Sequence, residues 1–562
     1  MKPSRLILWS LLLTLFSFSA GGETWYVRHD GGTRYSAKAP TGQCDGKTDA
    51  PYRGKGINQH CAFNDYRYLW DDWSYGKVAW VIAGGDTVII RGCVPNAENG
   101  YTHDCRVGFD KAATAGGGYT WCVGGSGGSG GCSNPVIPSG TPAHHTRILG
   151  QNYASCSVGN AVDKSKLTQI FGGFGVWETL NLGGAQYVDV QCLEITSHAK
   201  CIVHGYPAVP KACQPGTDDY DSDGISTDVN THDLLLQDLS IHGHTDRGIK
   251  GPIGGVVTAL RVDIAYNGMA GWDFDDGRAT PSVNGVWNFN YSTIEWSGCN
   301  QIYPGTNANT CYDDINGGYG DGVGTPPGIC LTANIDHSAF NYNTQDGLDL
   351  GHVDTGKCSM TVTNSTGIGN LGQPFKWGPN ENPAIFTNNT VVANCLRLSA
   401  PMTGQPSGYN AHLGDFCRSH DAISFNFRQR GTALLANNTI VTYAPTSFDI
   451  ACWDKGGCSV SSLIFKNNIV LGYDNPKTYN FGGKSGGPGG FYYQQPIGHV
   501  SRSSNVYYGI RGGGCSSGAL NERCVDPRFV SEPHFSTEQD LDNFNFHLSP
   551  STPAHGSGAD VR

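Results

Sequence analysis

The stretch that decides the fold is LANNTIV (residues 435–441), in which two short apolar-polar segments flank a pair of asparagines. Two related copies are FTNNTVVAN (residues 386–394) and FKNNIV (residues 465–470). Alternation of apolar and polar residues is typical of strands with one buried face. Asparagine tolerates the left-handed backbone that sharp bends require. The pattern predicts short strands joined by tight bends, with asparagine side chains stacked as ladders inside the molecule.

Related segments recur along the middle of the chain, at residues 236–243, 260–268, 289–298, 335–343 and 362–370. Where no insertion intervenes, the period is about 25 residues, which suits three short strands per coil of a solenoid. The spaced leucines of leucine-rich repeats do not recur, and a propeller needs a longer period. We therefore predict an all-β fold, a right-handed parallel β-helix in which each coil buries its inward residues against its neighbours.

The repeats divide the chain into four expected segments. These are a signal peptide (residues 1–20), a Cys- and Gly-rich N-terminal cap with early strands near 78–91 (residues 21–160), the parallel β-helix (residues 161–510), and a C-terminal cap (residues 511–562). Within the β-helix the period stretches near residues 299–329 and 396–432, so we expect insertions there. Insertions on a solenoid often line its working groove.

The N-terminus and the cysteines both indicate export. Lys2 and Arg5 precede an apolar run (residues 6–18) and small residues around Ala20, which is the pattern of a signal peptide and too short for a good membrane span. The chain has 20 cysteines and no C-x-x-C spacing, which favours disulfides over zinc. Close pairs that we expect to bridge locally are Cys122/Cys132 and Cys452/Cys458. We expect a secreted protein, extracellular or periplasmic, with no membrane span.

The net charge limits the classes of molecule that the protein can bind. With 37 basic and 48 acidic residues the net charge is -11, which argues against nucleic acid, because phosphate binding needs a basic surface. An acidic protein can still bind an acidic polymer when calcium bridges the two. No oligomerisation motif is present, so we expect a monomer.

Aligning the coils on their bends places four charged residues at equivalent positions: Lys250, Asp273, Asp349 and Lys376. Such positions stack about 4.8 Å apart, so they form a charged column on one face. Asp321 is expected in the coil between Asp273 and Asp349, and Asp346 lies three residues before Asp349. Carboxylates that converge repel one another, and calcium, which prefers several oxygen ligands, removes that repulsion.

Two runs around this cluster, NTQDGLDL (residues 343–350) and GQPFKWG (residues 372–378), resemble the calcium-dependent pectate lyases of polysaccharide lyase family 9. Those β-helix enzymes carry calcium-binding acids in an Asp-Asp-Gly-Phe-Asp-Leu segment and a base lysine one coil later. The resemblance implies that Asp346 and Asp349 bind calcium, that Asp321 is a third ligand, and that Lys376 is the base. Gln345 stands where the family has a further acid.

The chemistry implied is β-elimination of an acidic, uronate-containing polysaccharide such as pectate. A base takes the C5 proton, and a cation stabilises the charge that develops on the neighbouring carboxylate. A free lysine is protonated at neutral pH, and a nearby cation with partial burial would lower its pKa. Residues that we expect to bind the substrate are Lys250, Arg428, Arg430 and Trp377.

Two other classes of function stay open. The first is inverting hydrolysis of the polygalacturonase type, which needs two carboxyl groups separated by a water; its candidate residues are Asp223, Asp228, Asp273, Asp275, Asp276, His242, His244 and Lys250. The second is a non-catalytic carbohydrate-binding protein, in which sugars stack on aromatic side chains such as Trp272, Tyr319, Tyr342 and Trp377.

Overall fold

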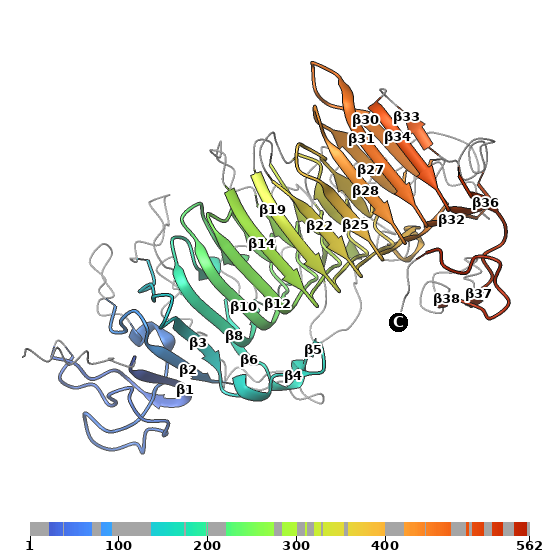
Figure 1. The fold of residues 1–562 in the computed structure, drawn as a ribbon. Coiled ribbons are helices and arrows are strands. Elements are labelled where there is room, and N and C mark those ends of the chain that lie inside the picture. Colours follow the sequence, from blue (N-terminus) through green and yellow to red (C-terminus); the bar gives the residue numbers. More distant parts are fainter. Residues whose placement is uncertain are drawn as a thin grey trace, which may run out of the picture.

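A computed structural model gives the fold of the chain (Figure 1). It describes residues 22–37, 39–69, 80–92, 136–172, 176–197, 199, 221–274, 284–300, 310–311, 320–326, 330–352, 358–398, 421–443, 446–473, 491–493, 497–510, 520–531 and 545–558. The expected signal peptide and the pair Cys122/Cys132 lie outside these residues. None of the described helices is long and apolar enough to cross a membrane.

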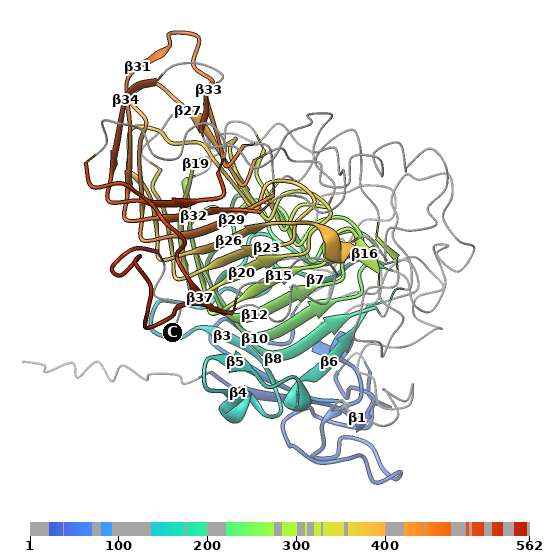
Figure 2. The same cartoon turned by 90° about the vertical axis from the view of Figure 1, so that its right-hand side faces the viewer.

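The described chain is a parallel β-helix, as the repeats predict. Three rows of strands run along an elongated molecule, and Figure 2 shows two of these rows meeting at an angle. The first row is β1 (Thr24–Gly32), β2 (Thr87–Arg91), β3 (Thr146–Gly150), β8 (Gln186–Thr196), β10 (His232–His242), β12 (Val256–Ala265), β14 (Asn284–Asn290), β19 (Cys330–Asp336), β22 (Met360–Thr363), β25 (Ala384–Thr387), β28 (Thr432–Ala436), β31 (Cys458–Lys466) and β34 (Ile497–Ser503).

The second row continues from the first across a bend and belongs to the same sheet, because β8, β10 and β12 run through both. Its further strands are β6 (Thr168–Phe171), β15 (Thr293–Glu295), β20 (Ala339–Asn341), β23 (Thr366–Ile368), β26 (Thr390–Ala393), β29 (Thr439–Thr442), β32 (Ile469–Gly472), β35 (Val506–Tyr508) and β36 (Arg523–Cys524).

The third row is a separate sheet of ten parallel strands, which carries the charged column. In order along the molecule it contains β7 (Val176–Asn181), β9 (Asp221–Ser226), β11 (Ile249–Lys250), β13 (Trp272–Asp273), β18 (Val323–Gly324), β21 (Leu348–Leu350), β24 (Phe375–Trp377), β27 (Ile423–Phe427), β30 (Phe448–Cys452) and β33 (Phe491–Tyr493).

Small elements decorate the coils. Three antiparallel hairpins are β4 (Ser157–Val158) with β5 (Ala161–Val162), β16 (Cys299–Asn300) with β17 (Thr310–Cys311), and β37 (Phe529–Ser531) with β38 (Asn545–Leu548). The described helices are single 3-10 turns: η1 (Tyr66–Leu69), η3 (Tyr153–Ser155), η4 (Lys164–Lys166) and η6 (Leu396–Leu398). The all-β fold class is therefore confirmed.

The bend between the first two rows explains the Asn pairs. Asn388, Asn437 and Asn467, the first asparagine of each pair, have left-handed backbones with φ of 64°, 58° and 56°. The second asparagine of each pair points inward. The Nδ2 of Asn438 donates to Asn468 Oδ1 at 2.9 Å and to the carbonyl oxygen of Phe386 at 3.0 Å. The predicted asparagine ladder is therefore confirmed.

The ladder extends beyond the asparagine pairs. Backbone amides of Ser292, Ser338 and Ser365 donate in turn to the side chains of Ser338, Ser365 and Asn389. At the other end, Asn505 Nδ2 donates to the buried carboxylate of Glu522 at 3.0 Å. Small polar side chains satisfy the backbone amides at the bends from Val262 to Asn468, where no strand pairing is available.

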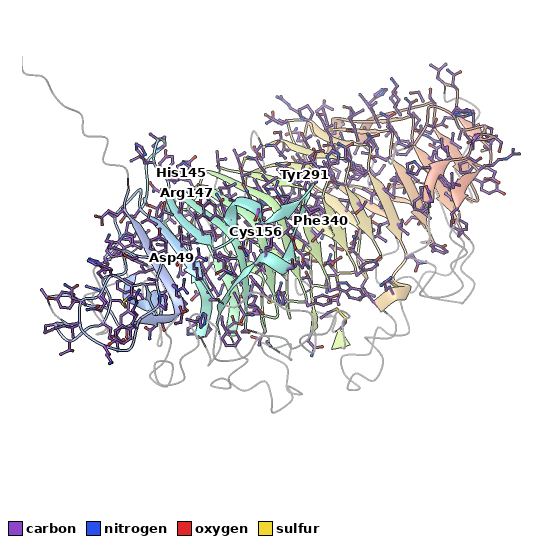
Figure 3. All side chains as sticks on the ribbon, turned by 90° about the horizontal axis from the view of Figure 1, so that it is seen from below. Asp49, His145, Arg147, Cys156, Tyr291 and Phe340 are labelled. Atoms are coloured by element: carbon purple, nitrogen blue, oxygen red, sulfur yellow. A yellow bond between two sulfur atoms is a disulfide. The ribbon has the colours of Figure 1, made fainter. Side chains whose placement is uncertain are left out.

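The core is a continuous column of apolar and aromatic side chains inside the coils. Figure 3 labels Phe340 and Tyr291, which lie in neighbouring coils. Phe340 is fully buried and packs near Phe289. Tyr291 lies at a bend, where its ring stacks on that of His337 with 4.7 Å between the ring centroids. Inward and outward residues alternate in the ten-stranded sheet as well, since Leu348 and Leu350 are in the core and Asp349 is not. The side chain of Asp349, which lies between these two leucines in the strand, therefore faces away from the core.

Disulfides join parts of the chain in five places within the described residues: Cys44–Cys61, Cys156–Cys192, Cys299–Cys311, Cys330–Cys358 and Cys452–Cys458. The last confirms one of the two predicted local bridges. No described cysteine is free. Such cysteine usage indicates folding in an oxidising compartment.

The β-helix begins earlier than residue 161. Strand β1 pairs in parallel with β2, β2 with β3, and β3 with β8, so the first sheet already starts at Thr24. At the other end β35 pairs with β36, which carries the sheet to Cys524. The early strands are separated by intervals of sequence much longer than the period, which hides the repeat.

Candidate functional site

The ten-stranded sheet brings the predicted charged column into register. Lys250 pairs with Asp273, Asp273 pairs with Gly324, and Asp349 pairs with Lys376. Strand β18, with Gly324, lies between the strands of Asp273 and Asp349. The four aligned residues thus occupy equivalent places, as predicted from the coil alignment.

Asp321 and Asp346 form a second column beside the first. Asp321 lies three residues before Gly324, and Asp346 lies three residues before Asp349. The backbone amide of Asp346 donates to Asp321 Oδ1 at 2.9 Å, and the amide of Gln373 donates to Asp346 Oδ1 at 2.7 Å. Asp321 therefore lies in the coil expected for it, one step away from Asp346. Each carboxylate accepts a backbone amide of the next coil, which fixes its orientation.

The Lys376 side chain contacts carboxylates of both columns. Its Nζ is 2.7 Å from Asp349 Oδ2 and 3.4 Å from Asp346 Oδ2. The other oxygen of Asp349 accepts the amide of Gly351 at 2.7 Å. Only 19% of the Lys376 side chain is exposed, although it points away from the core. The predicted cluster of three carboxylates and one lysine is therefore assembled on one face.

The cluster holds more negative than positive charge. Burial, together with repulsion from Asp346 and Asp349, raises the pKa of Asp321 well above its usual range. Burial alone would lower the pKa of Lys376, but attraction to Asp346 and Asp349 outweighs it and raises that pKa. Lys376 is accordingly an ammonium ion at neutral pH in this arrangement.

The donor set suits calcium in chemistry, because Asp321, Asp346 and Asp349 offer oxygen ligands and excess negative charge. Its arrangement differs from a preformed metal site. Lys376 pairs with two of the three carboxylates, and the part of the chain that the structure describes contains no group of three or more metal-binding side chains placed to hold an ion. Gln345 stands where the resembling family has an acid. It directly precedes Asp346 in the sequence, and its side chain is buried. Calcium would have to displace the lysine from these oxygens.

A second charged cluster occupies the N-terminal part of the same sheet. Lys250 Nζ is 3.4 Å from Asp223 Oδ2, and Arg247 Nε donates to Asp273 Oδ2 at 2.7 Å. Burial and the charge of Asp223 raise the pKa of Glu178 to about 7. Lys250 therefore belongs to this cluster, four strands away from Lys376, which is roughly 19 Å at strand spacing.

The residues considered for hydrolysis do not form one site. His244 is buried against Asp221 at 2.8 Å, whereas His242 lies on the other sheet and contacts Glu194 at 2.7 Å. Asp228 accepts the amides of Gly184 and Asn230 in a turn. Asp275 and Asp276 lie outside the described residues. Of the described members of this set, Asp223, Asp273 and Lys250 share the charged face.

The expected substrate-binding residues differ in position. Arg428 follows β27, near the cluster, and Arg430 is exposed in the next turn with a left-handed backbone (φ 63°). Trp377 is 1% exposed and packs on Phe386 in the core, which corrects our expectation that it contacts the substrate. The reason is strand alternation: if Lys376 faces outward, its neighbours Phe375 and Trp377 must face inward.

Three residues near the cluster were not predicted from the sequence: His352, Asp421 and Trp453. Asp421 accepts from Gln373 Nε2 at 3.3 Å, and burial with the charge of Asp449 raises its pKa to about 7. His352 Nε2 is 3.8 Å from Asp349 Oδ2, and the His352 ring contacts Trp453. The order of Asp421 three residues before Ser424 repeats that of Asp346 before Asp349, a signal hidden by the preceding insertion.

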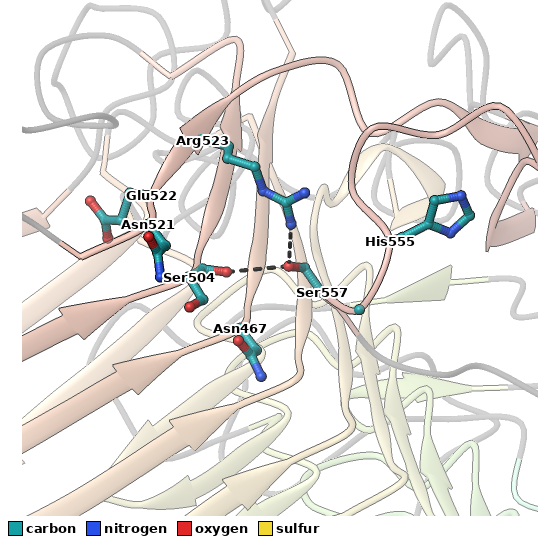
Figure 4. Close-up of a pocket in the computed structure, with 8 residues that line it drawn as sticks. Asn467, Ser504, Asn521, Glu522, Arg523, His555 and Ser557 are labelled. Atoms are coloured by element: carbon teal, nitrogen blue, oxygen red, sulfur yellow. Dashed lines mark hydrogen bonds between the residues drawn. The ribbon is translucent and has the colours of Figure 1, made fainter.

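A polar pocket of about 420 Å³ lies elsewhere, at the C-terminal end of the molecule (Figure 4). Arg523 Nη2 donates to Ser557 Oγ at 3.0 Å, and Ser557 Oγ donates to the Ser504 carbonyl at 3.2 Å. These contacts attach the C-terminal segment to the last coil. The pocket is lined by the bend residues Asn467, Ser504 and Asn521 together with residues 522–523 and 555–557, so it lies where the C-terminal segment packs on the last coils.

No protein-family model matches the chain, and no curated protein matches it. Among solved structures it is similar to pectate lyase Pel9A, with a TM-score of 0.32 and 11% identity over 84% of this chain and 83% of that one. It is also similar to a GH136 lacto-N-biosidase from Eubacterium ramulus, with a TM-score of 0.28 and 12% identity over 89% of this chain and 65% of that one. At such scores the strand pairing of the chain itself, rather than these likenesses, establishes the parallel β-helix.

Proposed function

We propose that the chain is a secreted carbohydrate-active enzyme that binds an acidic, uronate-containing polysaccharide along the ten-stranded sheet and cleaves it by β-elimination. The observation that carries the proposal is the contact of Lys376 with Asp346 and Asp349 on the neighbouring strand, on an outward face lined by further charges. Lys376 is the base in this proposal. A surface ion-pair ladder would not need three carboxylates gathered around one lysine.

The proposed step is an elimination that breaks the C5–H and C4–O4 bonds of the uronate. Neutral Lys376 Nζ takes the proton from C5 of the uronate, the electron pair forms the C4=C5 double bond, and the C4–O4 bond breaks. The departing O4 takes a proton from solvent. The product carries an unsaturated uronate, which absorbs ultraviolet light, at its new non-reducing end.

Lys376 must lose its proton before it acts. Its attraction to Asp346 and Asp349 opposes this, so those carboxylates have to be neutralised or engaged elsewhere before proton transfer. Asp321, Asp346 and Asp349 would hold calcium, which supplies positive charge beside the substrate carboxylate when it is bound. Lys250 on β11 and Arg428, which directly follows β27 of the same sheet, would bind further carboxylates of the polymer.

The test is absorbance of the unsaturated product, measured with a panel of uronic-acid polysaccharides, with calcium and with chelator. The matched variants are Lys376→Ala and Lys376→Arg. Arginine keeps the positive charge but stays protonated, so it separates a base from a binding cation. Loss of product in both variants supports the base role. Product formation by Lys376→Arg would contradict it, and product in chelator would remove calcium from the proposal.

The second candidate is inverting glycoside hydrolysis, favoured by Asp421, a buried carboxyl group that accepts from Gln373 beside the cluster and whose pKa is raised to about 7 by burial and by the charge of Asp449. A carboxyl that keeps its proton near neutral pH is suited to general acid catalysis. New reducing ends without absorbance, lost in Asp421→Asn, would establish this alternative. Binding without any product would leave a non-catalytic carbohydrate-binding protein.

A further inference from the structure

Trp453 is an exposed tryptophan beside the candidate site. It directly follows β30 and is 41% exposed. Within the described ranges only one other tryptophan is comparably exposed, Trp177 on β7 at 48%, whereas Trp272, Trp287 and Trp377 are buried in the core. A large aromatic side chain kept at the surface forgoes the stabilisation that burial would bring, and such residues are enriched at binding sites.

Contacts connect Trp453 to the lysine. The rings of Trp453 and His352 lie 5.4 Å apart, His352 Nε2 is 3.8 Å from Asp349 Oδ2, and Asp349 Oδ2 is 2.7 Å from Lys376 Nζ. Trp453 is thus separated from the Lys376–Asp349 pair by a single side chain. A sugar ring on Trp453 would belong to the same polymer that reaches Lys376.

Arg428 gives this aromatic surface a positive charge. Its guanidinium carbon lies 5.5 Å from the Trp453 ring centroid. Its Nε is buried and has no hydrogen-bond acceptor in the part of the chain that the structure describes. A buried donor of this kind is costly to leave unpaired, and a guanidinium binds a carboxylate through two parallel hydrogen bonds.

The loop that carries Trp453 is held rigidly. The disulfide Cys452–Cys458 closes it, and the Trp453 amide donates to the Phe427 carbonyl at 2.9 Å. Asp454 accepts the amides of Gln429 at 3.1 Å and Gly456 at 2.9 Å. An aromatic side chain fixed in this way loses little conformational entropy when it binds a ligand.

We propose that Trp453 and Arg428 form a subsite for one carboxylated sugar ring of the polysaccharide, adjacent to Lys376. The apolar face of the ring packs on the Trp453 indole, and the sugar carboxylate accepts hydrogen bonds from Arg428. The assignment deepens the proposed function and rests on it for the identity of the ligand. It replaces Trp377, which the core holds, with a tryptophan that a polymer can reach.

The test is calorimetric binding of uronate oligosaccharides and of their methyl esters to the full mature chain. The measurements use the Lys376→Arg background, so that cleavage does not consume the ligand. Trp453→Ala should weaken binding of acid and ester alike by about tenfold, in keeping with a lost aromatic contact. Arg428→Gln should weaken binding of the acid form and leave the ester nearly unchanged. Trp177→Ala, the matched control at the far end of the sheet, should bind like its parent.

The outcomes separate the subsite from the reaction. Unchanged affinity in Trp453→Ala, or equal losses in Trp453→Ala and Trp177→Ala, overturns the subsite even if the enzyme forms unsaturated product. Binding that depends on Trp453 and Arg428, without unsaturated product from the parent chain, supports the subsite and ends the lyase proposal. Absence of binding to every uronate oligosaccharide overturns both.

Discussion

At the residue scale, the chemistry of the candidate site depends on the charge state of Lys376. Two buried acids, Asp346 and Asp349, contact a single ammonium group, and a third, Asp321, accepts the backbone amide of Asp346. The same contacts that hold the lysine in place also keep it protonated. In this arrangement Lys376 cannot act as the proposed base, and the proposed proton transfer requires a change in the charge of the carboxylates.

Removing this ammonium group should destabilise the protein. Lys376→Ala leaves Asp346 and Asp349 buried without their counter-charge, and breaking a buried ion pair in this way costs about 3 kcal/mol. Lys376→Arg retains the charge and should lose much less. Chemical denaturation monitored by circular dichroism compares the two. Equal stability of Lys376→Ala and the parent would mean that the pair is solvated and that the lysine is not held by these carboxylates.

Asp421 makes a testable contribution to the pH dependence of stability. Burial raises its pKa in the folded state to about 7, above the value of an exposed aspartate. As pH rises from about 4 to 7, the unfolded state loses this proton while the folded state keeps it, so the free energy of unfolding falls across that window. Asp421→Asn should remove this part of the fall. Melting temperatures measured between pH 4 and pH 8 test it, and parallel curves for variant and parent would contradict the raised pKa.

At the scale of elements, the bends rather than the strands carry the repeated polar sequence. Strands of two to five residues form most of the ten-stranded sheet, and each depends on the coils on either side. Asn389, Asn438 and Asn468 tie consecutive bends together by side-chain hydrogen bonds. The ladder ends on Glu522, which also accepts from Arg502 and Tyr507. Polar groups inside a solenoid are tolerated because each has a partner in the next coil.

A substitution at the inward asparagine of a pair should lower the stability of the protein much more than a substitution at the outward one. Asn438→Ala removes the acceptor of the Asn389 amide and the donor to Phe386, leaving buried groups unpaired, with an expected loss of about 2 kcal/mol. The control is Asn437→Gly, because glycine keeps the left-handed backbone at that bend. Thermal unfolding distinguishes them. Similar melting temperatures for the two variants would show that the ladder adds little.

At the scale of the whole molecule, the fold is a one-dimensional stack. The first sheet runs from β1 to β36, and each strand pairs only with strands of adjacent coils. Stability in such a stack is close to a sum over coils and their interfaces. The long arrangement also explains how two charged clusters, around Lys250 and around Lys376, share one face four strands apart.

Substitutions in distant coils should act independently. Leu236→Ala, at a fully buried position of β10, should cost about 3 kcal/mol as a large-to-small core change. Combined with Asn438→Ala, the two losses should add, because the sites share no partner. Denaturation of both single variants and the double variant tests this. If the loss of stability in the double variant differed strongly from the sum of the two single losses, the two coils would be energetically coupled and the prediction would be wrong.

The period of the Asn pairs and the alternation around them determined the parallel β-helix, the bends and the asparagine ladder, because a regular repeat can bury its apolar residues only by stacking. The same period was sufficient to align Lys250, Asp273, Asp349 and Lys376, since equivalent positions in stacked coils must be neighbours. Alternation within FKW also implied that Trp377 faces the core, a consequence that the motif resemblance obscured. Only the tertiary structure decided the early start of the sheet, because the strands there are separated by intervals of sequence much longer than the period. It alone brought His352, Arg428 and Trp453 together, since these contacts depend on the paths of loops across several coils. It also decided the protonation of Lys376, because a pKa depends on the summed burial and charge of groups that no local sequence pattern specifies.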